Sequence, residues 1–114
     1  MVKKISIIIK ELLYKELLLK MNDIIIYTKS GCIYCDKTKK LLESLDLIYH
    51  EIVLNQNEEN YETKKNELFN LYNHRSFPII IINKKLFGGH ANLVNAYNTL
   101  KLHQFYNSRG FNVN

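Results

Sequence analysis

Two cysteines spaced three positions apart are the residues of this sequence best suited to chemistry. Cys32 and Cys35 are its only cysteines. A thiolate attacks a disulfide sulfur to give a mixed disulfide, and a second thiol close by resolves it. The C-x-x-C spacing brings both sulfurs to one face of the first turn of a helix. We therefore interpret Cys32 as the attacking sulfur of a thiol–disulfide exchange and Cys35 as the resolving sulfur.

The residues before Cys32 predict a setting that ionises its thiol. An apolar run at residues 24–27 has the length of a strand buried on both faces, residues 28–31 form a loop, and a helix begins at Cys32. Free backbone N–H groups and the helix dipole stabilise a thiolate at such a position. The thiol pKa then falls from ~8.5 into the range ~3.5–7.5, and Lys29 adds a positive charge nearby.

Two other uses of the cysteines compete with this interpretation. One is inert burial, since free cysteines behave as small apolar residues. The other is a zinc site completed by histidines. No second C-x-x-C and no H-x-x-x-H spacing exists, so we predict no metal site. The histidines available for such a site are His50, His74, His90 and His103.

The hydrophobic pattern predicts an α/β sheet covered by helices on both faces, because strand-like apolar runs alternate with segments of helical periodicity. Inward positions are expected at Leu41, Leu42 and Leu45 of one helix and at Tyr61, Leu68, Leu71 and Tyr72 of the next. The expected elements are a helix at 3–20, strands at 24–27, 47–54, 79–82 and 86–87, helices from 32, over 57–73 and after 89, and a hairpin turn at 83–84.

Length and composition indicate one domain. We assign 1–21 to an N-terminal helical extension, 22–108 to the domain and 109–114 to a C-terminal tail.

The net charge is +5, but sixteen Lys and Arg are interleaved with eleven acids, so no basic arm typical of nucleic-acid binding stands out. No stretch is long enough to cross a bilayer, and two neighbouring cysteines do not resemble the bridges of a secreted protein. We expect a cytoplasmic monomer that binds neither nucleic acid nor membranes.

The single proline, Pro78, precedes the expected strand at 79–82. A proline that merely starts a strand is one interpretation. A cis bond after Phe77, which would present backbone groups to a bound peptide, is the one that we favour beside the cysteines.

Four segments in this order resemble a glutaredoxin of the thioredoxin-like superfamily. Residues 27–35 are similar to its strand, lysine loop and C-P-Y-C site, and residues 75–78 to its T-V-P segment. Residues 82–89 are similar to its hairpin with a glycine pair, and residues 90–93 to the start of its last helix.

The resemblance implies a four-stranded mixed sheet flanked by helices, with the N-terminal helix as an addition. It implies glutathione as co-substrate, and disulfide-bonded or glutathionylated proteins as substrates, ribonucleotide reductase among the candidates. The glutathione site would comprise Lys29, Tyr34, Arg75, Phe77, Pro78, Gly89, Ala91 and Asn92.

Three departures from the family pattern keep alternatives open. Ile33 replaces the proline of C-P-Y-C, a change that sometimes accompanies a glutathione-ligated [2Fe–2S] cluster bridging a dimer. Ala91 and Asn92 replace hydroxyl and acidic residues that hold the ligand's ammonium group, and Phe77 replaces a smaller valine. We favour a dithiol glutaredoxin without a cluster; a third alternative is a thioredoxin-type donor recharged by a flavin reductase.

Overall fold

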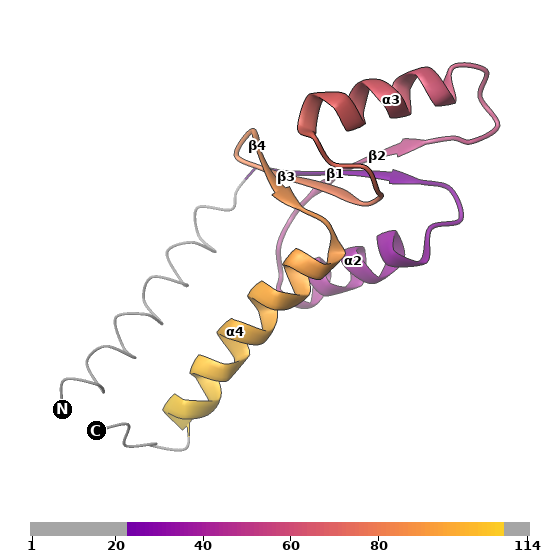
Figure 1. Cartoon of the computed structure of the whole chain (residues 1–114). Helices are drawn as coiled ribbons and strands as arrows, with labels where there is room; N and C mark the ends of the chain where they lie inside the picture. The colour runs from indigo at the N-terminus through magenta and orange to yellow at the C-terminus, as the bar shows by residue number, and fades with distance from the viewer. Residues whose placement is uncertain (1–22, 109–114) are drawn as a thin grey trace. The chain divides into compact units, whose positions relative to one another are not determined.

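Four strands form a mixed sheet in the order β2-β1-β3-β4 (Figure 1). The computed structural model describes the backbone of residues 23–108 and the side chains of residues 23–99. The central β1 pairs in parallel with β2 and antiparallel with β3, and β3 pairs antiparallel with β4. The strands are β1 (Ile24–Lys29), β2 (His50–Leu54), β3 (Ile79–Ile82) and β4 (Lys85–Gly88).

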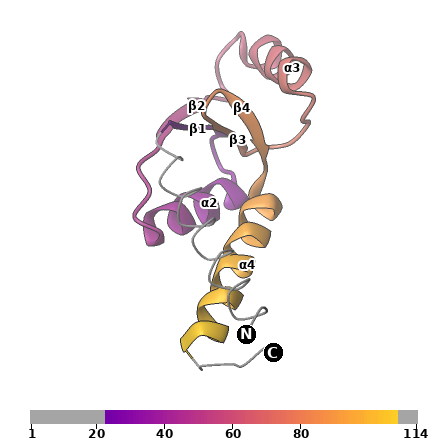
Figure 2. The same cartoon turned by 90° about the vertical axis from the view of Figure 1, so that its left-hand side faces the viewer.

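Two helices cover opposite faces of this sheet. Helix α2 (Ile33–Ser44) connects the parallel strands β1 and β2 and lies on one face, whereas α3 (Tyr61–Tyr72) lies on the other, as Figures 1 and 2 both show. A third helix, α4 (His90–Ser108), follows β4. The predicted mixed sheet with flanking helices is therefore confirmed.

The segment Asn22–Leu93 is one compact unit, and α4 from Val94 onward belongs to a second one. The predicted helix at 3–20, the extension 1–21 and the tail 109–114 lie outside the described residues, so these domain boundaries stay predictions. Among the described helices, none combines the length and apolar character needed to cross a membrane.

Strand β1 is buried on one face only, contrary to the expectation. Ile24, Ile26 and Thr28 are buried, whereas the alternate residues are half-buried. On that second face Tyr27 packs against Tyr72 of α3, with ring centroids 6.2 Å apart. The two residues come from elements far apart in sequence, so this pairing fixes α3 over β1.

Helix α3 starts at Tyr61, four residues later than the predicted range of 57–73. Asn55 closes a turn first, since its side-chain oxygen accepts from the N–H of Asn57 and its carbonyl from that of Glu58, both at 3.0 Å. The half-buried positions then follow the spacing 61, 65, 68, 69 and 72. Leu71 falls off this stripe and is 71% exposed, so its predicted burial is wrong.

The hairpin between β3 and β4 is confirmed. Asn83 and Lys84 both have positive φ angles, 51° and 68°. Two consecutive left-handed residues are the conformation of a two-residue turn whose twist matches that of the flanking strands. Lys84 pays a steric cost there that an asparagine or glycine avoids, since a long side chain rarely adopts this conformation.

Candidate active site

The cysteine pair lies at the junction of β1 and α2. Cys32 is the N-cap of α2, with extended backbone angles, and its Sγ accepts a hydrogen bond from the Cys35 N–H at 3.2 Å. The two cysteines form a disulfide, with Cα atoms 5.2 Å apart. Cys32 is 9% exposed and Cys35 only 1%. Cys32 is therefore the more accessible of the two cysteines, which agrees with the predicted division between attacking and resolving sulfur.

The turn into α2 depends on Gly31. Its φ of +71° lies in the left-handed region, which glycine adopts without steric cost. The carbonyl of Cys32 then accepts the first bond of the helix, from the Asp36 N–H at 3.2 Å. The chain thereby passes from a buried strand to a helix start within two residues, which brings Cys32 to the edge of the sheet.

The loop before β3 faces the cysteines across the site. The Phe77–Pro78 peptide bond is cis, as expected from the sequence. The carbonyl oxygen of Phe77 lies 4.0 Å from the Sγ of Cys32. Phe77 also contacts Phe69 of α3, with ring centroids 5.4 Å apart, so α3 supports the loop from behind.

A groove of about 520 Å³ opens beside Cys32. It brings together five of the residues that the sequence singled out: Lys29, Cys32, Tyr34, Arg75 and Phe77. The groove also includes six residues not expected there: Gly31, Ile33, Tyr61, Lys65, Phe69 and Ser76. Pro78, Gly89, Ala91 and Asn92 do not line it.

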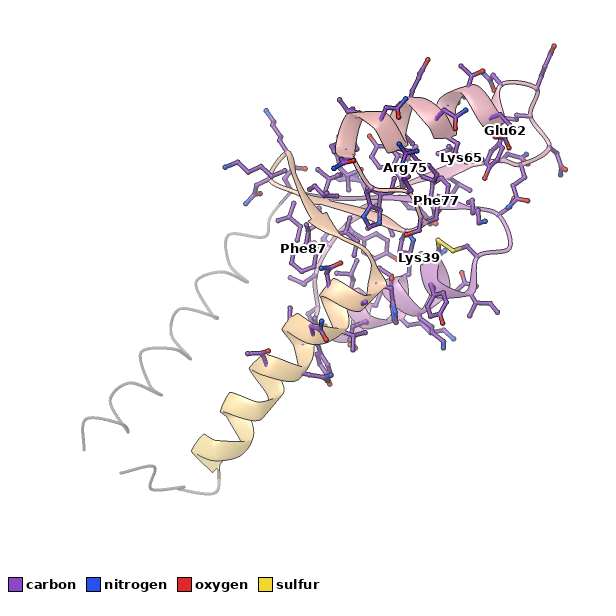
Figure 3. The ribbon with its side chains drawn as sticks, in the orientation of Figure 1. Lys39, Glu62, Lys65, Arg75, Phe77 and Phe87 are labelled. Atoms are coloured by element: carbon purple, nitrogen blue, oxygen red, sulfur yellow. A yellow bond between two sulfur atoms is a disulfide. The ribbon has the colours of Figure 1, made fainter. Side chains whose placement is uncertain are left out.

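Lys65 is the most informative of the unexpected residues. With Lys29 and Arg75 it makes three cationic side chains around one groove, and Figure 3 shows Lys65, Arg75 and Phe77 between α3 and the disulfide. Its Nζ pairs with Glu62 at 2.8 Å, and this hydrogen bond raises the pKa of Lys65.

Aromatic rings fix where the Lys65 ammonium group lies. It is 5.7 Å from the ring centroid of Tyr61 and 6.0 Å from that of Phe69. Residues four apart share a helix face, so the sequence spacing of Tyr61, Lys65 and Phe69 held the signal that would have placed this lysine toward the site.

Tyr34 forms the exposed rim of the site. Its ring lies 5.3 Å from that of His90, the first residue of α4, and the Nζ of Lys37 is 5.4 Å from its centroid. The Tyr34 ring, at the start of α2, is thereby in contact with the first residue of α4.

Gly88, Gly89 and Asn92 interact with one another at the start of α4. Gly89 N–H donates to the Asn92 Oδ1 at 3.0 Å, which is the bond that a side chain in the first turn makes back to the residue before the helix in a capping box. Gly88 has a φ of +139°, and a Cβ there would collide with the Asn92 side chain. The oxygen of Asn92, a residue that the resemblance includes in the glutathione site, thus already accepts a backbone hydrogen bond, while Ala91 is exposed.

Charged and polar side chains connect β1, β2 and α2. Thr28 donates to Glu51 at 2.7 Å, and Lys39 pairs with the same carboxylate at 3.1 Å, which raises the pKa of Lys39. Among the residues that the structure describes, no three His, Cys, Asp or Glu side chains gather into a group that could hold a metal ion.

Comparison with known proteins agrees with this arrangement. A model of the glutaredoxin family matches residues 24–87, more than half of the chain. Glutaredoxin-C8 of Oryza sativa subsp. japonica is 31% identical over 90 residues, which cover 77% of this chain and 65% of that protein. Glutaredoxin-C4 of Arabidopsis thaliana is 31% identical over 81 residues, 71% of this chain and 59% of that protein. The chain therefore spans less than two thirds of the length of these relatives.

The fold agrees as well. The crystal structure of a buckwheat glutaredoxin–glutathione complex superposes with a TM-score of 0.62 at 22% identity, over 88% of this chain and 92% of that one. The segment matched by the family model contains the cysteine pair, the cis proline and the hairpin described above. With its thioredoxin-like sheet and its C-x-x-C helix start, this chain belongs to the glutaredoxin family.

Proposed function

We propose that this protein is a glutathione-dependent thiol–disulfide oxidoreductase that reduces protein disulfides and glutathione mixed disulfides. The observation that carries the proposal is the position of Cys32. Its sulfur accepts a backbone hydrogen bond at a helix start and borders a groove with three cationic side chains. Such a position stabilises a thiolate, the species that attacks disulfides.

The reaction on a protein disulfide has two exchanges. The Cys32 thiolate attacks one sulfur of the substrate, and the other substrate sulfur leaves as a thiolate that takes a proton from water. Cys35 then loses its proton and attacks Cys32, which forms the Cys32–Cys35 disulfide of the present structure and releases the second substrate thiolate. Two electrons pass from the dithiol to the substrate.

Glutathione returns the enzyme to its dithiol form. One glutathione thiolate attacks the Cys32 sulfur and frees Cys35, and a second attacks the bound glutathione sulfur, which yields glutathione disulfide and the Cys32 thiolate. On a glutathionylated protein, Cys32 attacks the glutathione sulfur directly and the protein thiol leaves. This route does not use Cys35.

The groove suits an anionic tripeptide. Glutathione carries two carboxylates, and Lys29, Lys65 and Arg75 supply cationic side chains to the lining of the groove. Arginine and lysine bind carboxylates by charge-assisted hydrogen bonds. The buckwheat relative, whose structure is a complex with glutathione, supports this ligand for the present chain. We also propose that the protein acts as a cytoplasmic monomer, without nucleic acid or membrane as a partner.

A glutathione mixed-disulfide assay, coupled to glutathione reductase, tests the proposal on wild type and two variants. Cys32→Ser is expected to abolish turnover of both a glutathionylated peptide and a protein disulfide. Cys35→Ser is expected to lose reduction of the protein disulfide and to keep removal of glutathione. Activity of Cys32→Ser on the glutathionylated peptide would falsify the mechanism. Replacing glutathione by thioredoxin reductase as the recycling system should leave turnover near background; efficient recycling would favour a thioredoxin-type donor.

A further inference from the structure

A buried hydroxyl without a partner lies one helical turn beyond the resolving cysteine. The side chain of Thr38 is 0% exposed, and its Oγ1 has no hydrogen-bond partner among the described residues. The buried residues of α2 are Cys35, Thr38 and Leu42. Residues three apart on a helix are neighbours, with Cβ atoms about 5–6 Å apart. The Thr38 hydroxyl and the Cys35 sulfur therefore share one buried face.

Other hydroxyls of the chain show how unusual this is. Thr99 in α4 donates to the Asn95 carbonyl four residues earlier, at 2.9 Å. Thr28, buried like Thr38, donates to Glu51 at 2.7 Å. Thr38 has neither kind of bond, although an unpaired buried hydroxyl is costly. When the group finds its partner in another state of the protein, the cost falls on one state alone and shifts the equilibrium toward the other.

We propose that Thr38 is a positioning residue for Cys35, whose sulfur accepts a hydrogen bond from the Thr38 hydroxyl once the disulfide is reduced. In the disulfide, the Cys35 Sγ is bonded to the Cys32 Sγ. Reduction frees the Cys35 side chain to turn about its Cα–Cβ bond toward Thr38. The hydroxyl is then satisfied in the dithiol and mixed-disulfide forms and unpaired in the disulfide form.

This bond has a consequence for the resolving step, and here the inference rests on the proposed function. In that step Cys35 gives its proton to water, its thiolate forms the bond to Cys32, and the Cys32–substrate bond breaks. The substrate sulfur leaves as a thiolate and takes a proton from water. A hydroxyl that donates to Cys35 stabilises its thiolate and, with it, the reduced enzyme relative to the disulfide.

The test is a redox titration of the purified protein against dithiothreitol, which does not require any reaction with glutathione. Thr38→Val keeps the shape of the side chain and removes the hydroxyl. This variant is expected to shift the equilibrium between dithiol and disulfide about tenfold toward the disulfide. For a two-electron couple, this shift corresponds to a reduction potential about 30 mV lower. Thr38→Ser, which keeps the donor, is expected to remain within about twofold of wild type.

Two controls separate this role from simple packing. Thr99→Val also removes the hydroxyl hydrogen bond of a helical threonine, an exposed one in α4, and it should leave the redox equilibrium unchanged. Thermal unfolding of Thr38→Val should show a lower Tm for the reduced form, and an unchanged or higher Tm for the oxidised form. Thr38→Ala serves in the same two measurements if the valine variant does not fold.

Equal Tm changes in both redox states, or an unshifted equilibrium in the valine and alanine variants, would overturn the proposal. So would a serine variant that behaves like valine, or a Thr99→Val shift of the same size. Because the titration uses dithiothreitol, a protein that fails every glutathione assay can still pass this test, and the two proposals fail separately.

Discussion

The backbone N–H of Cys35 donates to the sulfur of Cys32, 3.2 Å away. The donor is the peptide group and not the side chain of Cys35, so it belongs to the turn that starts α2. Any residue at position 35 that preserves the helix start preserves this bond. The activation of Cys32 is therefore separable from the presence of its resolving partner.

From this follows a prediction on the reactivity of Cys32. In Cys35→Ser, where Cys32 is the only thiol, alkylation by iodoacetamide should keep at least half its maximal rate at about pH 7.5, the upper limit for thiols at helix starts. The pH profile of the alkylation rate checks this. A profile that matches free cysteine, half-ionised at about pH 8.5, would contradict the role of the helix start.

Lys65 is predicted to contribute to glutathione affinity. Lys65→Met removes one of the three cations of the groove and should raise the KM for glutathione about twofold to fivefold with little change in kcat, since partly exposed ion pairs are weak. Steady-state kinetics at low ionic strength measure this effect, and added salt should diminish it.

The neighbouring Lys64 is the matched control. It lies on the same helix and pairs with Glu58 at 3.6 Å, but it lines a different pocket, between β2 and α3. Lys64→Met should leave the KM unchanged. If both substitutions raised the KM equally, Lys65 would act only through the general charge of the surface and not through its place in the groove.

Asn92 is predicted to stabilise the start of α4. Asn92→Ala removes the acceptor of the Gly89 N–H and should lower the free energy of unfolding by about 1 kcal/mol, the usual value of a helix cap. Asn92→Asp keeps the acceptor and adds a negative charge at the positive end of the helix, so it should be at least as stable as wild type. Urea unfolding measures both, with the exposed Asn98→Ala as control. An alanine variant as stable as wild type would show that this cap is not needed.

The protein is predicted to lose stability in alkaline solution. Burial, and then the neighbouring Tyr72, raise the pKa of Tyr27 above its ordinary value of about 10. A raised pKa means that the folded state holds its proton more tightly than the unfolded chain, so the stabilisation is complete below about pH 10 and is lost as pH rises through the folded value. Urea midpoints between about pH 8 and pH 11 should fall less steeply in Tyr27→Phe than in wild type. Parallel curves for the two proteins would rule out this contribution.

Local patterns were sufficient to predict the parts of the site that lie close in sequence. The strand–loop–helix around Cys32, the cis bond at Pro78 and the turn at Asn83 each depend on a few adjacent residues. Placing the true start of α3 required knowing that Asn55 forms a turn of its own. An asparagine beside two glutamates also fits a helix cap, and only the competing bonds decide between the two.

Tertiary burial was harder to predict from the sequence. The runs at β1 and β3 are both rich in isoleucine, yet Ile79, Ile80 and Ile81 are all buried, whereas β1 alternates. The difference comes from which elements cover each face, and this information is distributed along the chain. Thr38 is the clearest case, because a polar residue between lysines gives no local sign that it lies in the core.

The unequal exposure of the two cysteines also has a consequence for their oxidation by peroxide. Peroxide and electrophiles dissolved in the surrounding medium collide with Cys32, while Cys35 is sheltered beneath it. A sulfenic acid formed on Cys32 would then have the Cys35 thiol within bonding reach, and condensation with loss of water would give the Cys32–Cys35 disulfide seen in the structure. The different exposure of the two cysteines would thus protect Cys32 from irreversible overoxidation.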